Sequence, residues 1–465
     1  MNESQKATAL LATILTFQLA CHLVSIDKVF MNDEGTHITG GWLLERGMVP
    51  YKEFALLQYL PGAAILASVS FSILGPELQS AKLFIAGVML LSTAMVFLIA
   101  RRLYGNYAAL VASFFFALLA PPFGSLMFMP EPIMTLLVLV LFWLLSKSDK
   151  EGGIALLMAS GTVCALIVLM KIPGLAVLFA SIAFLMARAY LKKERAARFA
   201  SDIGLLLLGF AIPLAILFLW FSHLGVLDDV YSQVIFQLLF RTQEKLLSDP
   251  ADIALNLILV LIPVAYLPTV SRDLKKGKMD SVILFLLALA SLYSIIIRFQ
   301  PNRVLYALPL LSIMGGAIFE ERIGERERRF ILGFGVILAS VTLAAVSLWG
   351  GESPGTEEME EFVLTHTSLS DKILIVPYGH VYYFLMKREP GYRYLGLGPW
   401  GQPDDTEQNA VADLVLNRPK VIIYSKKPQW GKEFWEYEPL IDKYIWDNYE
   451  ITGENQFAYF MEPKK

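Results

Sequence analysis

The apolar stretch PGAAILASVSFSIL, residues 61–74, decides the fold, because its length determines on which side of a membrane every later loop lies. It has 14 residues, begins with Pro-Gly and is followed by Gly75-Pro76. A helix that spans a bilayer needs roughly 17–25 apolar residues, so this length favours an interfacial or re-entrant helix. We therefore predict that residues 61–74 do not cross the membrane.

The rest of the chain has the composition of a polytopic membrane protein. Of its 465 residues, 56% are hydrophobic and only 17% are charged, and the mean hydropathy is +0.55. Soluble domains carry about 25% charged residues. The net charge of −3 and the lack of a basic tract give no indication of nucleic-acid binding. We predict eleven spans, at 7–26 (a retained first helix), 83–100, 107–123, 131–146, 153–170, 174–190, 203–221, 253–270, 281–297, 304–319 and 330–349.

The basic residues agree with this count and orient the helices. If residues 61–74 do not span and the N-terminus is cytoplasmic, five basic clusters fall on the cytoplasmic side, as the positive-inside rule requires. If the stretch spanned, all five would move outside. The first loop, residues 27–82, and the C-terminal region are then extracytoplasmic. The clusters are Arg101–Arg102, Lys147 with Lys150, 188–198, 271–278 and 321–329.

The composition changes after Gly350-Gly351, which divides the chain into a membrane domain (1–350) and a second domain (351–465). KILIVPY (372–378) and KVIIY (420–424) are typical of short buried strands. Amphipathic helices are predicted at 379–387, 405–417 and 433–447. Alternating strands and helices predict a small extracytoplasmic α/β domain.

Three of the carboxylates on the outer side are candidate site residues. Asp33 and Glu34 are adjacent, so on a helix they would point about 100° apart and could not face one ligand equally. Either they are solvated loop residues near a helix cap at Asn32, or one of them acts on a substrate while the other positions it. Glu131, between two prolines, either favours the N-terminus of its helix or is a second active-site carboxylate.

Three of the cations on the same face are candidate phosphate contacts, because they go against the charge bias. Lys171 ends the fifth span, and Arg298 and Arg303 flank one short outer loop. Lys171 is either a snorkelling lysine or a phosphate contact. The arginines either pair with the C-terminal domain or bind phosphate, for which the guanidinium is the preferred bidentate partner. Carboxylates and isolated cations at headgroup level are what an enzyme acting on a phosphate-linked lipid would need.

An ordered set of motifs runs along about residues 1–350. It consists of DEG (33–35), ERGMVPYKEF (45–54), YLPG (59–62), LG (74–75), Lys82, RRLYG (101–105), KIPG (171–174) and RVLYALPLL (303–311). This set resembles the GT-C class of membrane glycosyltransferases, which use polyprenyl-phosphate sugars and have an arginine in the place of Lys82. Relatives in this class include the protein O-mannosyltransferases and the lipid A aminoarabinose transferase. The resemblance implies juxtamembrane helices in the first outer loop.

The resemblance implies roles for single residues. Asp33 matches the proposed catalytic base, with Glu34 its neighbour, and Glu131 stands where many relatives have an aspartate. Lys171 matches a lysine before a Gly-Pro pair, although Ile172 replaces that glycine here. Arg303 precedes the segment that is linked to the donor phosphate.

Together these features predict an inverting glycosyltransferase in the cell membrane. It would move a sugar from a polyprenyl-phosphate donor to a lipid, glycan or protein acceptor at the extracytoplasmic face. No cofactor is required by the sequence, and no ligand spacing requires a metal, although Asp33, Glu34 and Glu131 allow a divalent cation. The alternative is a transporter or flippase for an anionic lipid-linked substrate, but the mid-span regions are nearly free of charge.

Overall fold

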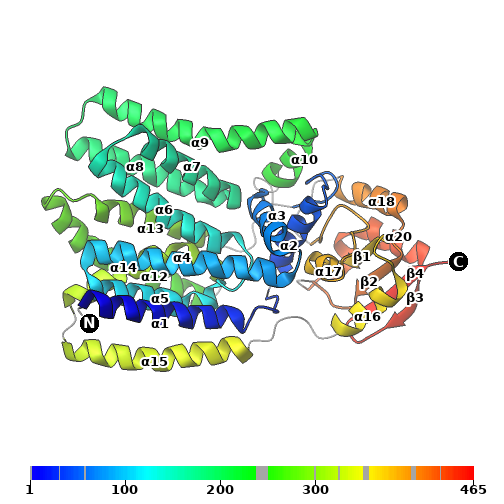
Figure 1. Cartoon of the computed structure of the whole chain (residues 1–465). Coiled ribbons are helices and arrows are strands. Elements are labelled where there is room, and N and C mark those ends of the chain that lie inside the picture. Colours follow the sequence, from blue (N-terminus) through cyan, green and yellow to red (C-terminus); the bar gives the residue numbers. More distant parts are fainter. Residues whose placement is uncertain are drawn as a thin grey trace. The chain divides into compact units, whose positions relative to one another are not determined.

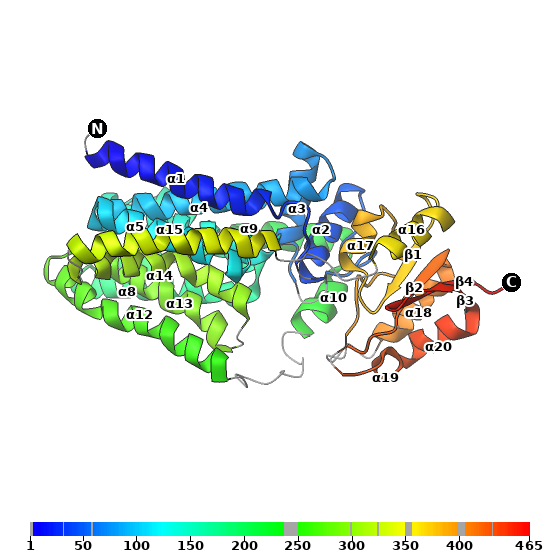
Figure 2. The same ribbon diagram turned by 90° about the horizontal axis from the view of Figure 1, so that it is seen from below.

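The structure is a computed structural model of the whole chain, shown in Figures 1 and 2. It describes residues 3–30, 32–56, 59–236, 250–297, 300–322, 325–348, 356–398, 405–429 and 431–465. The chain forms two compact units. The first contains Met1–Ile26, Lys82–Leu217 and Glu244–Trp349, and the second contains Asp27–Ala81, Phe218–Gln243 and Gly350–Lys465.

Long helices that lie side by side build the first unit (Figures 1 and 2). Each of the eleven predicted spans coincides with a helix, which confirms a polytopic helical protein of the membrane. Seven described helices are long and apolar enough to cross a membrane, and shorter apolar helices accompany them. The bundle helices are α1 (Glu3–Leu23), α4 (Leu78–Tyr104), α5 (Asn106–Leu119), α6 (Pro130–Glu151), α7 (Ile154–Met170), α8 (Leu175–Leu191), α9 (Ala196–Leu224), α12 (Pro250–Lys275), α13 (Asp280–Ile297), α14 (Pro301–Arg322) and α15 (Glu325–Leu348).

Glycines allow α7 and α9 to approach each other closely. A Cβ atom added at Gly161 would lie 2.0 Å from the carbonyl oxygen of Leu206, and one at Gly209 would lie 2.0 Å from that of Met158. The Thr162 hydroxyl also donates a hydrogen bond to the Gly209 carbonyl at 3.2 Å. Small residues at such crossings bring helix backbones into van der Waals contact, which drives helix association in lipid.

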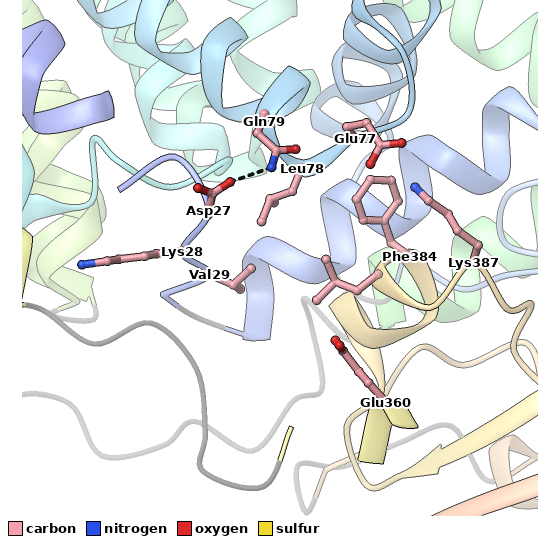
Figure 3. A pocket seen from close by; sticks show the side chains of 10 residues that line it. Asp27, Lys28, Val29, Glu77, Leu78, Gln79, Glu360, Phe384 and Lys387 are labelled. Atoms are coloured by element: carbon pink, nitrogen blue, oxygen red, sulfur yellow. Dashed lines mark hydrogen bonds between the residues drawn. The ribbon is translucent and has the colours of Figure 1, made fainter. Parts of the chain in front are cut away.

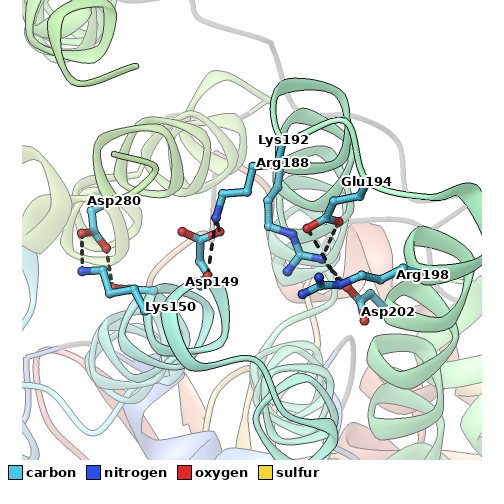
Figure 4. A network of polar contacts seen from close by, with 9 residues as sticks. Asp149, Lys150, Arg188, Lys192, Glu194, Arg198, Asp202 and Asp280 are labelled. Carbon is cyan, nitrogen blue, oxygen red and sulfur yellow. Dashed lines mark hydrogen bonds and ion pairs between the residues drawn. The ribbon is translucent and has the colours of Figure 1, made fainter. Parts of the chain in front are cut away.

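Ion pairs join the helix ends at one end of the bundle (Figure 4). Arg188, only 3% exposed, lies between Glu194 and Asp202. Two further pairs, Lys192–Asp149 and Lys150–Asp280, have N–O distances of 2.6 and 2.7 Å. Two of the basic clusters that the sequence assigned to one membrane face, Lys147 with Lys150 and 188–198, therefore meet at the same end of α6 and α8.

The first outer loop forms two helices in the second unit, α2 (Asn32–Glu45) and α3 (Gly62–Leu74). The α3 helix has 13 residues, about 20 Å at 1.5 Å per residue, which is shorter than the ~30 Å hydrocarbon core. It packs closely on α2, because a Cβ at Gly41 would lie 2.4 Å from the Ala67 methyl group. The prediction of short juxtamembrane helices in this loop is confirmed.

A small α/β fold completes the second unit. The two buried runs form strands, as predicted. These are β1 (Ile373–Val376) and β2 (Val421–Ser425), and they pair in parallel. The sheet order is β1-β2-β4-β3, and β4 (Ala458–Pro463) is antiparallel to both neighbours. The hairpin of β3 (Tyr449–Glu454) and β4 was not predicted. The accompanying helices are α10 (Leu227–Val230), α16 (Thr356–His366), α17 (His380–Leu385), α18 (Thr406–Asn417), α19 (Phe434–Tyr437) and α20 (Pro439–Asn448).

The crossing of α7 and α9 predicts the effect of one added methyl group. We expect Gly161→Ala to lower the free energy of unfolding by about 1–3 kcal/mol, because the new Cβ meets backbone that cannot move aside. Gly204→Ala on α9 is the control, since nothing lies within 4 Å of its Cβ position. Thermal unfolding of both variants in detergent checks this, and equal melting temperatures would contradict the close crossing.

Candidate active site

The α2 helix carries the adjacent carboxylates in its first turn, where negative charge is favourable next to the helix dipole. The Glu34 side chain is fully buried, and its Oε2 accepts a hydrogen bond from the Phe30 backbone N–H at 3.3 Å. Asp33 is only partly buried. The structure thus separates the pair, with Glu34 fixing the chain that leads into the helix and Asp33 left accessible.

Tyr59 holds the Asp33 carboxylate. Its hydroxyl donates to Asp33 Oδ2 at 3.1 Å, and its carbonyl accepts a hydrogen bond from the Tyr51 hydroxyl at 2.9 Å. The His37 ring packs edge-on against the Tyr59 ring, with centroids 4.7 Å apart. Tyr59 was not singled out from the sequence, although it opens the YLPG motif (59–62).

The C-terminal segment, residues 350–465, reaches the same helix through α17. The Thr36 hydroxyl lies 2.6 Å from His380 Nδ1, and the Thr39 hydroxyl donates to the His380 carbonyl at 2.6 Å. A Cβ at Gly35 would lie 2.3 Å from the Val381 backbone nitrogen, so only glycine permits this approach. Burial lowers the pKa of His380 to about 4, against the opposing effect of the nearby Asp33 charge, so the imidazole is neutral at pH 7.

A second cluster lies in the first unit, around the N-terminus of α6. Lys171 Nζ lies 2.6 Å from Glu131 Oε1, and the two side chains are 15% and 2% exposed. Asn302, at the start of α14, donates to the same oxygen at 3.3 Å. Arg303 also interacts electrostatically with Glu131, and its Nε donates to Gln300 at 3.0 Å. Within the described residues, Glu131 Oε2 is buried without a hydrogen-bond partner.

A buried lysine adds a further cation to the first unit. Lys82, 4% exposed, donates from Nζ to the Leu126 carbonyl at 3.1 Å. The sequence singled it out only as a motif position where relatives have arginine.

The structure therefore places the predicted site residues in two groups. Asp33 and Glu34 belong to the second unit, and Glu131, Lys171 and Arg303 come together in the first. Arg298 lies outside the described residues. Over the described ranges, no group of three His, Cys, Asp or Glu side chains has the arrangement of a metal site.

Comparison with known proteins shows a likeness in fold and, over part of the chain, in sequence. Residues 60–221 match the family model described as dolichyl-phosphate-mannose-protein mannosyltransferase. ArnT from Cupriavidus metallidurans, solved with undecaprenyl phosphate bound, superposes with a TM-score of 0.68 at 12% identity, over 99% of this chain and 98% of that one. The oligosaccharyltransferase AglB from Archaeoglobus fulgidus, in complex with an inhibitory peptide and a dolichol-phosphate, gives 0.54 at 13% identity, over 91% and 70%. No curated protein matches the sequence significantly.

The chain is thus a GT-C-fold membrane protein, as its motifs indicated. Over residues 60–221, about a third of the chain, the sequence is similar to the family described as dolichyl-phosphate-mannose-protein mannosyltransferase.

The Glu131–Lys171 pair predicts a rescue experiment. We expect Lys171→Met to lower the free energy of unfolding by about 3–5 kcal/mol, because it leaves a buried carboxylate without its partner. Adding Glu131→Gln should restore most of that loss, since both charges are then gone. Thermal unfolding in detergent measures both variants, and a double variant no more stable than the single one would contradict the pairing.

The neutral His380 predicts an acid-sensitive second unit. Because its folded pKa of about 4 lies below the ordinary histidine value of 6.5, the unfolded chain binds the proton first, and stability falls as pH drops from about 6.5 toward 4. Protonation of the unfolded chain at pH 5, well below the ordinary histidine pKa of 6.5, lowers the free energy of unfolding by roughly 2 kcal/mol. We expect His380→Asn to lose less in melting temperature between pH 7 and pH 5 than the wild type.

The control is His366→Asn on the exposed end of α16, which should follow the wild-type pH dependence. If His380→Asn also followed it, the buried neutral histidine would not be a source of the acid sensitivity.

Proposed function

We propose that the protein is a glycosyltransferase that moves a sugar from a polyprenyl-phosphate donor to an acceptor hydroxyl, with inversion at the anomeric carbon. The observation that carries the proposal is the separation of the two adjacent carboxylates. Glu34 is buried and bonded to backbone, whereas Asp33 keeps an accessible carboxylate that Tyr59 orients. This is the arrangement a general base needs, because the group must be both positioned and reachable.

The chemistry follows from that base. Asp33 accepts the proton of the acceptor hydroxyl while its oxygen attacks the anomeric carbon from the face opposite the phosphate. The bond from the anomeric carbon to the phosphate oxygen breaks, and the electron pair leaves with the lipid phosphate. A single displacement inverts the configuration. A phosphate leaving group needs little acid assistance, and preorganised cations stabilise the charge that develops on it.

We assign that role to Lys171 and Arg303, and by its sequence position to Arg298. Lys171 is held by Glu131, which supports assigning Glu131 to the positioning of the cation and not to proton transfer. Glu131 also accepts a hydrogen bond from Asn302 and interacts electrostatically with the half-buried Arg303, so one carboxylate lies among all three groups. No step of the proposed reaction uses a metal ion.

The same proposal includes the topology and the partners. The N-terminus is cytoplasmic, residues 1–350 form the catalytic membrane domain, and residues 351–465 form the extracytoplasmic α/β domain. Transfer takes place at the extracytoplasmic face of the cell membrane, onto a lipid, glycan or protein acceptor. The ion-paired basic loops at the ends of α6 and α8 support this orientation, since both clusters lie at one end of the bundle (Figure 4).

A transporter or flippase is the rival class, and the placement of charge favours the enzyme. Transporters keep ionisable groups near the bilayer midplane, often on broken helices. Here Glu131 lies in the first turn of α6 and Lys171 directly follows α7, so this pair is at helix ends.

The proposal is tested at Asp33. We expect Asp33→Asn to lower kcat for sugar transfer by about 10²–10⁴-fold, because an amide cannot accept the proton, while the protein stays folded. The assay supplies labelled polyprenyl-phosphate sugars to membranes containing the protein and identifies the glycosylated product. Glu45→Gln, at the exposed C-terminal end of the same helix, is the control and should transfer at the wild-type rate. Near-wild-type turnover by Asp33→Asn would overturn the assignment of the base.

A further inference from the structure

The second unit contains a pocket of about 520 Å³ between the first outer loop and the C-terminal segment (Figure 3). Pockets that bind small molecules usually measure about 300–1,000 Å³. The walls combine charged and apolar side chains. They are Asp27, Lys28 and Val29 before α2, Glu77, Leu78 and Gln79 at the start of α4, Glu360 on α16, and Phe384, Leu385 and Lys387 on or after α17.

The chain connections place this pocket at the membrane surface. Asp27 follows the last residue of the first candidate span, Leu23, by only four positions. Leu78 is the first residue of the next candidate span, which continues to Tyr104. Walls so close to the ends of two spans lie at the boundary between lipid and water, so a membrane-anchored molecule can present its polar end there.

Two of the charged side chains have structural roles. Gln79 donates to Asp27 Oδ1 at 2.6 Å, which ties the two chain segments together. Lys387 donates to the Pro76 carbonyl, and its ammonium lies 3.9 Å from the Phe384 ring centroid. Asp27 and Lys387 thus have hydrogen-bond partners within the protein and do not need a ligand to supply one.

Glu77 and Glu360 differ from them, because within the described parts of the chain neither carboxylate has a hydrogen bond or ion pair at salt-bridge distance. Both are acceptors that face the pocket (Figure 3). With three carboxylates against two lysines, the pocket disfavours a phosphate group. It favours a ligand rich in hydrogen-bond donors, and Phe384 and Leu385 offer apolar surface to the C–H faces of a sugar ring.

We propose that this pocket binds the hydroxyl-rich saccharide headgroup of a membrane-anchored acceptor, with Glu77 and Glu360 as the carboxylates that receive its hydroxyl groups. This inference rests on the proposed function and names the acceptor class, a glycolipid.

The pocket and the base share the same structural elements. Val29 lies four residues before Asp33, and Phe30 between them is bonded to Glu34. On the other wall, Phe384 and Leu385 belong to α17, whose first residue, His380, binds α2. One wall of the pocket is therefore the segment that leads into α2, which carries Asp33, and another is α17, which is bonded to α2.

Binding is measured without donor, on the full-length protein in detergent. The probe is a monoglucosyl diacylglycerol with a fluorescent acyl chain, and the competitor is phosphatidic acid with the same chains. We expect the wild type to bind the glycolipid, and the Glu77→Gln/Glu360→Gln double variant to bind at least tenfold more weakly. Glu358→Gln, exposed on the same helix as Glu360, is the matched control and should bind like the wild type.

Leu385→Trp, which fills the pocket, should abolish binding. If this variant does not fold, the conservative glutamine variants still show whether the pocket binds the glycolipid. The proposal is overturned if the double variant keeps wild-type affinity or if phosphatidic acid competes as well as unlabelled glycolipid. Transfer assays separate the two proposals. If sugar transfer depends on Asp33 but glycolipid binding does not depend on the pocket residues, only the proposed acceptor site is wrong. If binding depends on the pocket residues but no sugar is transferred, only the proposed enzymatic function is wrong.

Discussion

The second unit depends on the contact between α2 and α17. Gly35 lets the α17 backbone approach to a distance that no side chain would allow, and the hydroxyls of Thr36 and Thr39 then bind both the ring and the carbonyl of His380. A buried hydroxyl without a partner costs about 1–3 kcal/mol, so the contact is specific as well as close. The first outer loop, which carries Asp33, and the C-terminal segment are held in one compact unit by these interactions.

In the first unit, an ion pair compensates two largely buried charges. A lone lysine or glutamate at the edge of a bilayer would be costly to bury, but Lys171 and Glu131 offset each other at 2.6 Å. The pair also restricts the lysine to one direction, which a snorkelling side chain would not have. Asn302 also donates a hydrogen bond to the Glu131 carboxylate and thereby links α14 to the ion pair.

Sequence reasoning predicted the helices well, because apolar length and charge bias are strong local signals. The same signals placed residues 61–74 correctly as a short helix. The β3–β4 hairpin was not predicted, because most side chains of Tyr449–Glu454 are exposed and the strand lacks a buried run. The ion-pair partner of Lys171 was not predicted for another reason. No acidic residue lies near it in sequence, and Glu131 is 40 positions away. Tyr59 stood in a quoted motif, but nothing local indicated that it would contact Asp33.

The hydrogen bond between Thr36 and His380 joins residues 344 positions apart. On a ribosome, α2 is therefore made near the start of synthesis, whereas its partner helix emerges only when the bundle helices have been completed. Until then Gly35 and the two threonines face no α17 backbone. A chain released early, after the last bundle helix, would insert in the membrane with the carboxylates in place but without the contact that holds their helix. Maturation of the Asp33 helix is thereby tied to completion of the polypeptide.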